Sequence, residues 1–289
     1  MVTDTTDTTP KPFFQNDFAT VFLGDAIEVM SRLPDESIDL VFADPPYRLS
    51  NGGMSVQNGR QVSVNKGEWD RSMGTESDHE FNQRWLSECR RLLRADGTIW
   101  VSGTYHSIYS CGYAMQQLGF RFLNDISWFK PNASPNLGRR MFTASHETLI
   151  WASKSPKSKH VFNYDEMRDE AGLTDRFKNA GKQMRTVWEI DDESDVWSIP
   201  TTPAREKNFG RHPTQKPVKL LERIIASSSN RDGFVLDPFL GSGTTAEVAI
   251  KLGRHVVGID SSAAYLGEIA VPRIVEASTR SKQTPSIRA

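Results

Sequence analysis

The chain has 289 residues, with 35 Lys and Arg against 36 Asp and Glu and a net charge of −1, a composition typical of a globular protein. No apolar run approaches the ~18 residues of a membrane span, and the net charge argues against a strongly basic nucleic-acid binder, although local basic patches stay open. Two cysteines and six scattered histidines show no metal-binding or redox spacing. We therefore expect no bound metal and a cytoplasmic location.

The first part of the chain predicts strands that alternate with helices. Residues 1–18 form a polar N-terminal tail, and Thr20–Leu23 predicts a short strand followed by Asp25. A helix is expected over Ala26–Leu33, and the apolar run Ile38–Ala43 predicts a buried strand of a parallel sheet. Each strand is followed by an aspartate, at the edge where open α/β sheets bind ligands.

The tetrapeptide Asp44-Pro45-Pro46-Tyr47 follows the second of these strands. Its prolines restrict φ and donate no hydrogen bond, so their carbonyl acceptors point in nearly fixed directions. Tyr47 adds a flat aromatic face, and the cluster suits the amino group of a planar base. An ordinary turn at the end of a strand is also compatible with these residues. The Gly- and Asn-rich residues 48–71 predict a mobile lid over the cluster, or a disordered segment.

The middle of the chain predicts two amphipathic helices and three strands: helices Asp78–Leu93 and Ile108–Leu118, and strands Thr98–Ser102, Phe120–Lys130 and Glu147–Ala152. The last two strands are candidates for a pair at the sheet edge, and Asp96-Gly97 is expected to end the first helix. Residues 154–211 lose the pattern, and Lys and Arg outnumber Asp and Glu between Lys130 and Lys219. We expect an inserted, variable lobe there.

A second strand–helix–strand unit follows Pro217, which suits the first turn of a helix. Phe234–Asp237 predicts a strand, Gly241 and Gly243 predict a tight turn before a helix, and Val256–Asp260 predicts the next strand. Asp260 lies 19 residues after Gly241 (260 − 241), which is the spacing of a ribose-binding acid in nucleotide-binding folds. The pyrophosphate and phosphate-loop patterns are absent, which favours an adenosine ligand without phosphates.

The two units combine into one sheet if residues 212–277 are placed before residues 19–153. The result is a doubly wound, mostly parallel α/β sheet in a circularly permuted Rossmann-like order. A final helix is expected over Ala263–Ala277, and residues 278–289 form a polar C-terminal tail. Four neighbouring strands would then present acidic residues to one polar cleft: Asp237, Asp260, Asp25 and Asp44.

These motifs resemble the β-group of S-adenosylmethionine-dependent DNA amino-methyltransferases of restriction-modification systems. The resemblance covers about Val21 to Ala277, and its motifs are Asp44–Tyr47, Arg140-Met141-Phe142-Thr143 with Glu147 and Trp151-Ala152, His212–Pro217, and Asp237-Pro238-Phe239 with Gly241–Thr244. The stretches around Asn51–Gly53 and Lys66–Asp70 also resemble adenine methylases that include GATC modifiers. The resemblance implies a circularly permuted methyltransferase fold in which residues 154–211 are a small target-recognition lobe.

The resemblance further implies methyl transfer from S-adenosylmethionine to the exocyclic amino group of adenine in DNA, by direct displacement on a flipped-out base and without a metal. The catalytic residues would be Asp44 and Pro45, which accept the amino hydrogens, Pro46, and Tyr47, which stacks on the base. The residues implied in cofactor binding are Asp25, Ala26, Asp44, His212, Thr214, Lys216, Asp237, Phe239, Gly241, Ser242, Gly243, Thr244, Asp260 and Ser261.

Several of these implied roles have a structural alternative. Lys216 would pair with the cofactor carboxylate and Asp260 would hold the ribose. Asp25 would approach the adenine ring, unless it only caps the following helix. Asp237 could instead orient the glycine turn, and His212 could be a packed turn residue.

DNA, single- or double-stranded, is the expected partner, and a homodimer and a cognate restriction endonuclease stay open. Three alternative functions also stay open. Relatives that methylate the amino group of cytosine more often carry Ser at the position of Asp44. Enzymes that methylate amino groups in RNA or protein tend to carry Asn there. The third alternative is a catalytically silent DNA-binding subunit, against which the complete motifs argue.

Overall fold

A computed structural model of the protein describes residues 10–48, 54–57, 60–63, 70–131, 133, 135, 138–169, 181–190, 209–210 and 215–283. In this part of the chain, nine strands form one sheet in the order β1-β2-β11-β10-β3-β6-β8-β7-β9. The strands are β1 (Phe14–Gln15), β2 (Ala19–Leu23), β3 (Ile38–Ala43), β6 (Leu93–Gly103), β7 (Arg121–Phe129), β8 (His146–Ser153), β9 (Val187–Glu189), β10 (Phe234–Asp237) and β11 (His255–Asp260). The predicted α/β fold with a mostly parallel, circularly permuted sheet is confirmed.

The four strands that carry the predicted acidic residues lie side by side. β2, β11, β10 and β3 are mutually parallel neighbours, and β6 continues the parallel set beside β3. The chain moves outward in one direction from β10 to β11 and in the other direction from β3 to β6. The junction of β10 and β3 is therefore the switch point at which open α/β sheets bind ligands.

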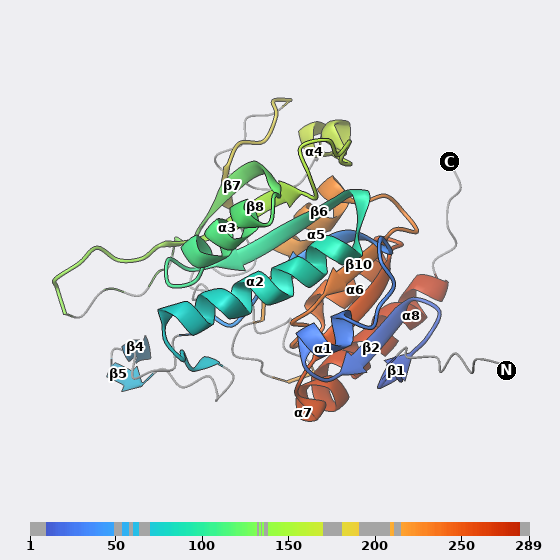
Figure 1. Ribbon diagram of the computed structural model, residues 1–289, viewed down its shortest axis with the longest axis horizontal. Coiled ribbons are helices and arrows are strands. Elements are labelled where there is room, and N and C mark those ends of the chain that lie inside the picture. Colours follow the sequence, from blue (N-terminus) through green and yellow to red (C-terminus); the bar gives the residue numbers. More distant parts are fainter. Residues whose placement is uncertain are drawn as a thin grey trace, which may run out of the picture.

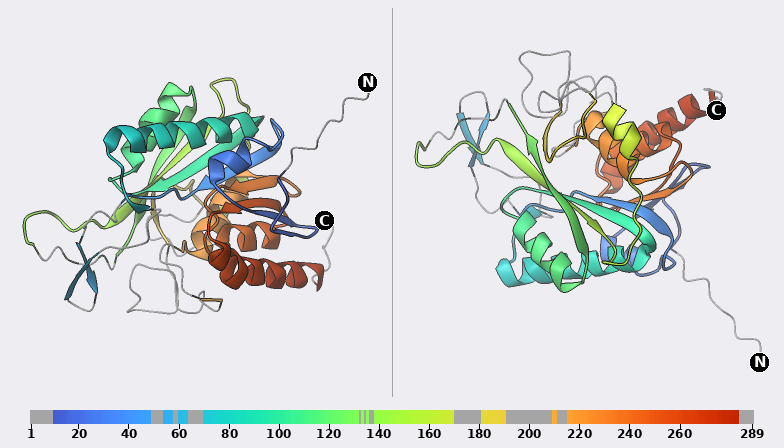
Figure 2. Two further views of the ribbon diagram at one scale, coloured as in Figure 1. Left: turned by 60° about the horizontal axis from the view of Figure 1, so that its bottom comes forward. Right: turned by 90° about the horizontal axis from the view of Figure 1, so that it is seen from above.

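Helices cover both faces of the sheet, as Figures 1 and 2 show. One face carries α1 (Ala26–Met30), α2 (Thr75–Leu92) and α3 (Ile108–Gln117), and the other carries α5 (Val218–Ser228), α6 (Thr244–Lys251) and α8 (Val271–Gln283). The left view of Figure 2 places α2 and α8 on opposite sides of the sheet. Each face has its own apolar core.

The side chains of β3 show how one strand supplies both cores. Leu40 and Phe42 are buried on the face of α5, α6 and α8, whereas Val41 and Ala43 are buried on the face of α1, α2 and α3. Successive side chains of a strand point to opposite faces, so a central parallel strand is a continuous apolar run. This is why the sequence predicted the bounds of β3 and β10 to the residue.

Part of the predicted lobe joins the main sheet. β9 pairs with β7 in parallel and forms the sheet edge, so β7 and β8 pair with each other as expected but do not end the sheet. Trp188 of β9 packs against Trp100 of β6, and the short helix α4 (Tyr164–Asp169) is tied to α5 through Asn163, which donates to the Ala226 carbonyl. The sequence did not predict these contacts, because α4 and β9 are too short to show an apolar periodicity.

Other segments differ from the prediction at their ends. The expected lid contains a two-stranded antiparallel ribbon, β4 (Met54–Gln57) and β5 (Arg60–Ser63). Asp96-Gly97 lies within β6 rather than after a helix, because Leu93 already pairs with Ile38 and the register then shifts. The last helical stretch runs through α7 (Ala263–Tyr265) and the π-helical turn η3 (Leu266–Ala270) into α8, so it extends six residues into the predicted C-terminal tail. Part of the N-terminal tail is β1, which pairs with β2.

Candidate active site

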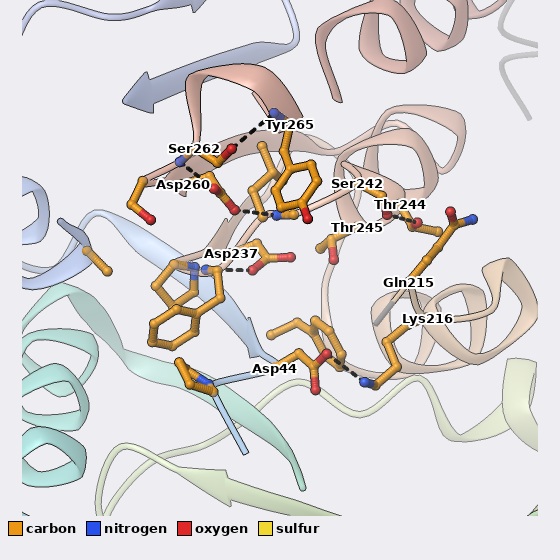
Figure 3. Close-up of a pocket in the computed structure, with 18 of the residues that line it drawn as sticks. Asp44, Gln215, Lys216, Asp237, Ser242, Thr244, Thr245, Asp260, Ser262 and Tyr265 are labelled. Atoms are coloured by element: carbon orange, nitrogen blue, oxygen red, sulfur yellow. Dashed lines mark hydrogen bonds and ion pairs between the residues drawn. The ribbon is translucent and has the colours of Figure 1, made fainter. Parts of the chain in front are cut away.

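The aspartates at the ends of four adjacent strands border one cavity of about 300 Å³ (Figure 3). Asp260 of β11 lies at one end, Asp237 of β10 in the middle, and Asp44 after β3 at the other end. Asp25 follows β2 and also lines the cavity. A volume of this size is at the lower end of the range for small-molecule sites.

Most of the predicted site residues line this cavity. They are Asp25, Ala26, Asp44, Pro46, Lys216, Asp237, Phe239, Gly241, Ser242, Thr244, Asp260 and Ser261. Pro45, Tyr47 and Gly243 are not among the lining residues. His212 and Thr214 lie outside the described residues. The early and late parts of the chain therefore build one shared pocket, as the permuted order predicted.

The glycine turn is held by Asp260. Gly241 and Gly243 have φ values of 51° and 75°, a left-handed conformation that L side chains rarely adopt. A Cβ at Gly243 would also lie 3.0 Å from the Ala270 Cα. The Asp260 carboxylate accepts from the backbone N–H of Gly241 and of Ser262, each at 2.8 Å. Asp260 thus orients the turn, the role that the sequence left open for Asp237.

Asp25 caps the helix that follows it. Its Oδ1 accepts from the backbone N–H groups of Ile27 at 2.9 Å and Glu28 at 3.0 Å, which satisfies two donors of the first turn of α1. The capping that the sequence left open as an alternative is therefore observed, and Asp25 borders the cavity as well.

Asp237 is the most buried carboxyl group of the cavity, with 3% of the residue exposed. Its Oδ1 accepts from the Phe239 backbone N–H at 3.0 Å. Burial raises the pKa of Asp237 to about 7, because the ionised form loses its hydration. Burial also raises the pKa of Asp260. The centre of the cavity can therefore take up or lose a proton near neutral pH.

Asp44 is part of a charged network that also includes Tyr47, Lys216 and Glu147. Lys216 Nζ donates to Asp44 Oδ2 at 2.5 Å, and the Tyr47 hydroxyl donates to Asp44 Oδ1 at 2.7 Å. Burial lowers the pKa of Lys216, but the carboxylates of Asp44 and Glu147 outweigh it and hold that pKa above its usual value. Burial and the same carboxylates raise the pKa of Tyr47, so its phenol stays protonated.

The structure shows the surroundings of two predicted site residues in this network, Tyr47 and Lys216. Tyr47 was expected to offer an open stacking face, but the residue is only 6% exposed and Lys216 Nζ lies 5.3 Å from the centre of its ring. Lys216 was expected beside the methionine end of a cofactor; it borders the cavity, where it pairs with Asp44. The Lys216 ammonium is thus buried between the Tyr47 ring and carboxylates that come from distant parts of the chain.

Several residues of the site were not assigned from the sequence. The cavity is also bordered by Tyr265, Ser262, Thr245, Gln215, Arg48 and Phe81. Thr245 continues the glycine motif and Tyr265 lies five residues after Asp260, so both had a local signal. Glu147 was part of a recognised motif without a role, and nothing in the sequence connected it to Tyr47.

The donor set fits S-adenosylmethionine. The Asp260 carboxylate can accept from ribose hydroxyls, and the further carboxyl groups of the cavity, Asp237 and Asp44, suit a cationic ligand. Among the described residues, no cluster of three or more His, Cys, Asp or Glu could hold a metal ion. No helix in the described ranges is long and apolar enough to cross a membrane.

The fold and the cavity define a class: proteins with a doubly wound α/β sheet and a ligand cavity at the carboxyl ends of its parallel strands. Comparisons with known proteins specify the class further. The sequence profile described as DNA methylase matches residues 38–271. The chain belongs to this DNA methylase family, and it is an S-adenosylmethionine-dependent DNA methyltransferase.

Curated relatives match nearly the whole chain. The Type II methyltransferase M2.LlaDCHI of Lactococcus lactis subsp. cremoris is 46% identical over 270 residues, covering 93% of this chain and 94% of the relative. The Type II methyltransferase M2.DpnII of Streptococcus pneumoniae is 45% identical over 257 residues, covering 89% and 90%. These relatives identify a methyltransferase of the restriction-modification type.

Solved structures share the fold. The M1.HpyAVI–SAM complex is 24% identical with a TM-score of 0.60, covering 89% of this chain and 98% of that chain. The PvuII DNA methyltransferase, which is cytosine-N4-specific, is 19% identical with a TM-score of 0.65, covering 95% and 96%. Identity at this level shows a common architecture, with a methyl donor bound in the first of these structures.

Proposed function

We propose that the protein transfers the methyl group of S-adenosylmethionine to the exocyclic N6 amino group of adenine in a short DNA sequence. The observation that carries this proposal is the position of Asp44. Its carboxylate borders the same cavity as the Gly241–Thr244 turn, at the switch point between β10 and β3. A base amine bound at Asp44 would therefore lie close to the ligand held by that turn.

When bound, S-adenosylmethionine supplies an electrophilic methyl group on a sulfonium. The work of the protein is to localise the lone pair of an amine that is conjugated with its ring. The Asp44 carboxylate and the Pro45 carbonyl accept the two amino hydrogens, which directs the lone pair into the cavity. The rate gain comes from positioning and preorganised dipoles. The target base must leave the duplex stack first, at a cost of a few kcal/mol.

Among the proposed cofactor contacts, Asp260 and Ser261 would bind the ribose. Asp237 and Thr244 would lie at the methionine end. Asp25 and Ala26, which line the cavity at the start of α1, are proposed to contact the adenine ring. Lys216 borders the same cavity and is proposed as a further cofactor contact. His212 and Thr214 complete the proposed set, although they lie outside the described residues.

Adenine is proposed rather than cytosine because Asp44 stands where cytosine-specific relatives more often carry Ser. The test incubates purified protein and labelled cofactor with duplex and single-stranded DNA, including a GATC-containing duplex, followed by hydrolysis to nucleosides. We expect the label in N6-methyladenine, and Asp44→Asn should abolish it while cofactor binding is retained. Label in N4-methylcytosine, or only in RNA or protein, would refute the choice of substrate.

We further propose that the protein belongs to the β-group, because its catalytic tetrapeptide precedes the glycine turn in the chain. Residues 154–211 are proposed to read the target sequence. A cognate endonuclease is proposed from the Type II relatives, and a homodimer from the resemblance to the group. Mapping of modified bases in an expressing host tests the target sequence. Sedimentation of the purified protein tests the dimer.

A further inference from the structure

Two carboxylates compete for one buried ammonium in the catalytic network. Lys216 Nζ is 2.5 Å from Asp44 Oδ2 and 3.8 Å from Glu147 Oε2. The side chains of Lys216, Asp44 and Glu147 are 8%, 12% and 13% exposed. A charge this buried needs a partner at all times, because water cannot replace the lost hydration.

The Lys216 ammonium is bound to the Asp44 carboxylate, which the proposed reaction needs as the acceptor for an amino hydrogen. Asp44 Oδ2 accepts from Lys216 (Figure 3), and Asp44 Oδ1 accepts from the Tyr47 hydroxyl, so each oxygen already has a donor. An ammonium at this distance also neutralises the carboxylate and weakens its pull on an amino hydrogen. Each oxygen can accept a second hydrogen bond. For Asp44 to offer its full negative charge to the amine of a base, however, Lys216 must move away from it.

Glu147 is placed to take the displaced ammonium. It lies on β8, and its Oε2 is also 3.3 Å from the Tyr47 hydroxyl, whose oxygen in turn accepts from Lys216 at 3.1 Å. Lys130 pairs with the other oxygen, Oε1, and so holds the Glu147 carboxylate in place. A shift of Lys216 from Asp44 toward Glu147 therefore keeps the ammonium paired, while the Asp44 carboxylate keeps hydrogen bonds from the Tyr47 hydroxyl and gains them from the amino group of the base.

We propose that Glu147 is a positioning residue for methyl transfer: it receives the Lys216 ammonium when the amino group of the flipped base takes its place on Asp44. The role rests on the proposed function and deepens it. No bond is made or broken in this step, and the net charge of the network does not change. Glu147 thereby couples entry of the base to release of the Asp44 acceptor.

The first test is Glu147→Gln, which keeps the shape and removes the charge. With saturating cofactor and DNA, the single-turnover rate of methyl transfer should fall at least about tenfold, in the range of losses for one partner of a coupled network. The dissociation constant for cofactor should stay within about twofold, because Glu147 does not line the cavity. Fluorescence of 2-aminopurine at the target position should show a reduced flipped population. Asp125→Asn, an exposed carboxylate on β7, is the matched control and should behave as wild type.

The second test separates this role from a structural one. If Glu147 acts by receiving Lys216, then Glu147→Gln should cost nothing further in a Lys216→Met background. Losses that multiply in the double variant would overturn the proposal. Should Glu147→Gln fail to fold, as judged by its unfolding midpoint, Glu147→Asp keeps the charge but shortens the reach, and an intermediate rate is expected. A wild-type rate in Glu147→Gln or in Glu147→Asp, with an active wild-type enzyme, would refute this inference alone. A wild-type protein that transfers no methyl group to DNA would refute the proposed function with it.

Discussion

Replacing Asp237 by Asn removes a carboxyl group from the middle of the cavity while keeping its size and its acceptor. The Asn oxygen can still accept from the Phe239 backbone N–H, as Asp237 Oδ1 does at 3.0 Å. What changes is the proton balance. The pKa of Asp237 rises from 3.8 to about 7 on folding, mainly because the carboxyl is buried. The folded state therefore keeps a proton over a pH range in which the unfolded state has lost it.

The sign of the effect follows from this difference. Below pH 3.8 the Asp237 carboxyl is protonated in the folded and the unfolded state, so this group does not make the free energy of unfolding depend on pH. Between the two pKa values the unfolded state binds fewer protons, so the free energy of unfolding falls as pH rises. Each pKa unit corresponds to ~1.4 kcal/mol, which makes the loss about 3 kcal/mol between pH 5 and pH 8.

Urea unfolding followed by tryptophan fluorescence at several pH values measures this loss. The difference in unfolding free energy between wild type and Asp237→Asn should shift by about 3 kcal/mol in favour of the variant from pH 5 to pH 8, because other titrating groups cancel. A positively charged ligand should favour the ionised form, so wild-type affinity for S-adenosylmethionine should rise from pH 6 to pH 8 and that of the variant should not. Parallel stability profiles for the two proteins would show that the Asp237 carboxyl does not carry a raised pKa.

Three further predictions concern the turn, the DNA surface and the thiols. Gly243→Ala should lower the free energy of unfolding by roughly 1–3 kcal/mol, because φ is 75° and the new Cβ would meet backbone at 3.0 Å. Arg139 and Arg140 are exposed on the connection between β7 and β8, at the same edge of the sheet as Asp44. Changing both to Gln should weaken DNA binding and reduce the slope of log affinity against log salt concentration by about 0.9 for each lost phosphate contact. Cys89 and Cys111 should not react with a thiol reagent in the native protein, because both are buried and burial raises the pKa of Cys111 to about 12.

Matched variants test each of these expectations. Gly119→Ala shares a positive φ of 79° but has no atom closer than 4.0 Å, so it should cost less than the change at Gly243, and equal costs would contradict the clash. Lys157 and Lys159 are exposed beyond the opposite edge of the sheet, so changing both to Gln should leave DNA affinity and the salt slope unchanged. Rapid labelling of either cysteine before unfolding would contradict the packing of the core.

The sequence alone determined the central strands, the acid that follows each of them, and the cavity that these acids border. The physical reason is that these features are local. A strand buried on both faces is a continuous apolar run, its acidic neighbour marks the ligand edge, and the glycines of the turn are required by their own φ values. β3 and β10 were therefore predicted with their observed bounds, and Asp237 and Asp260 at their observed edge.

Only the tertiary structure decided which side chains meet at Asp44. Lys216 is 172 residues from Asp44 along the chain and 169 from Tyr47, and no local pattern records such a pair. The same is true of three other features: the burial of Tyr47, the position of Glu147 beside it, and the addition of β9 to the sheet edge. Each depends on how separate elements pack, because a buried charge takes the partner that the fold brings within reach.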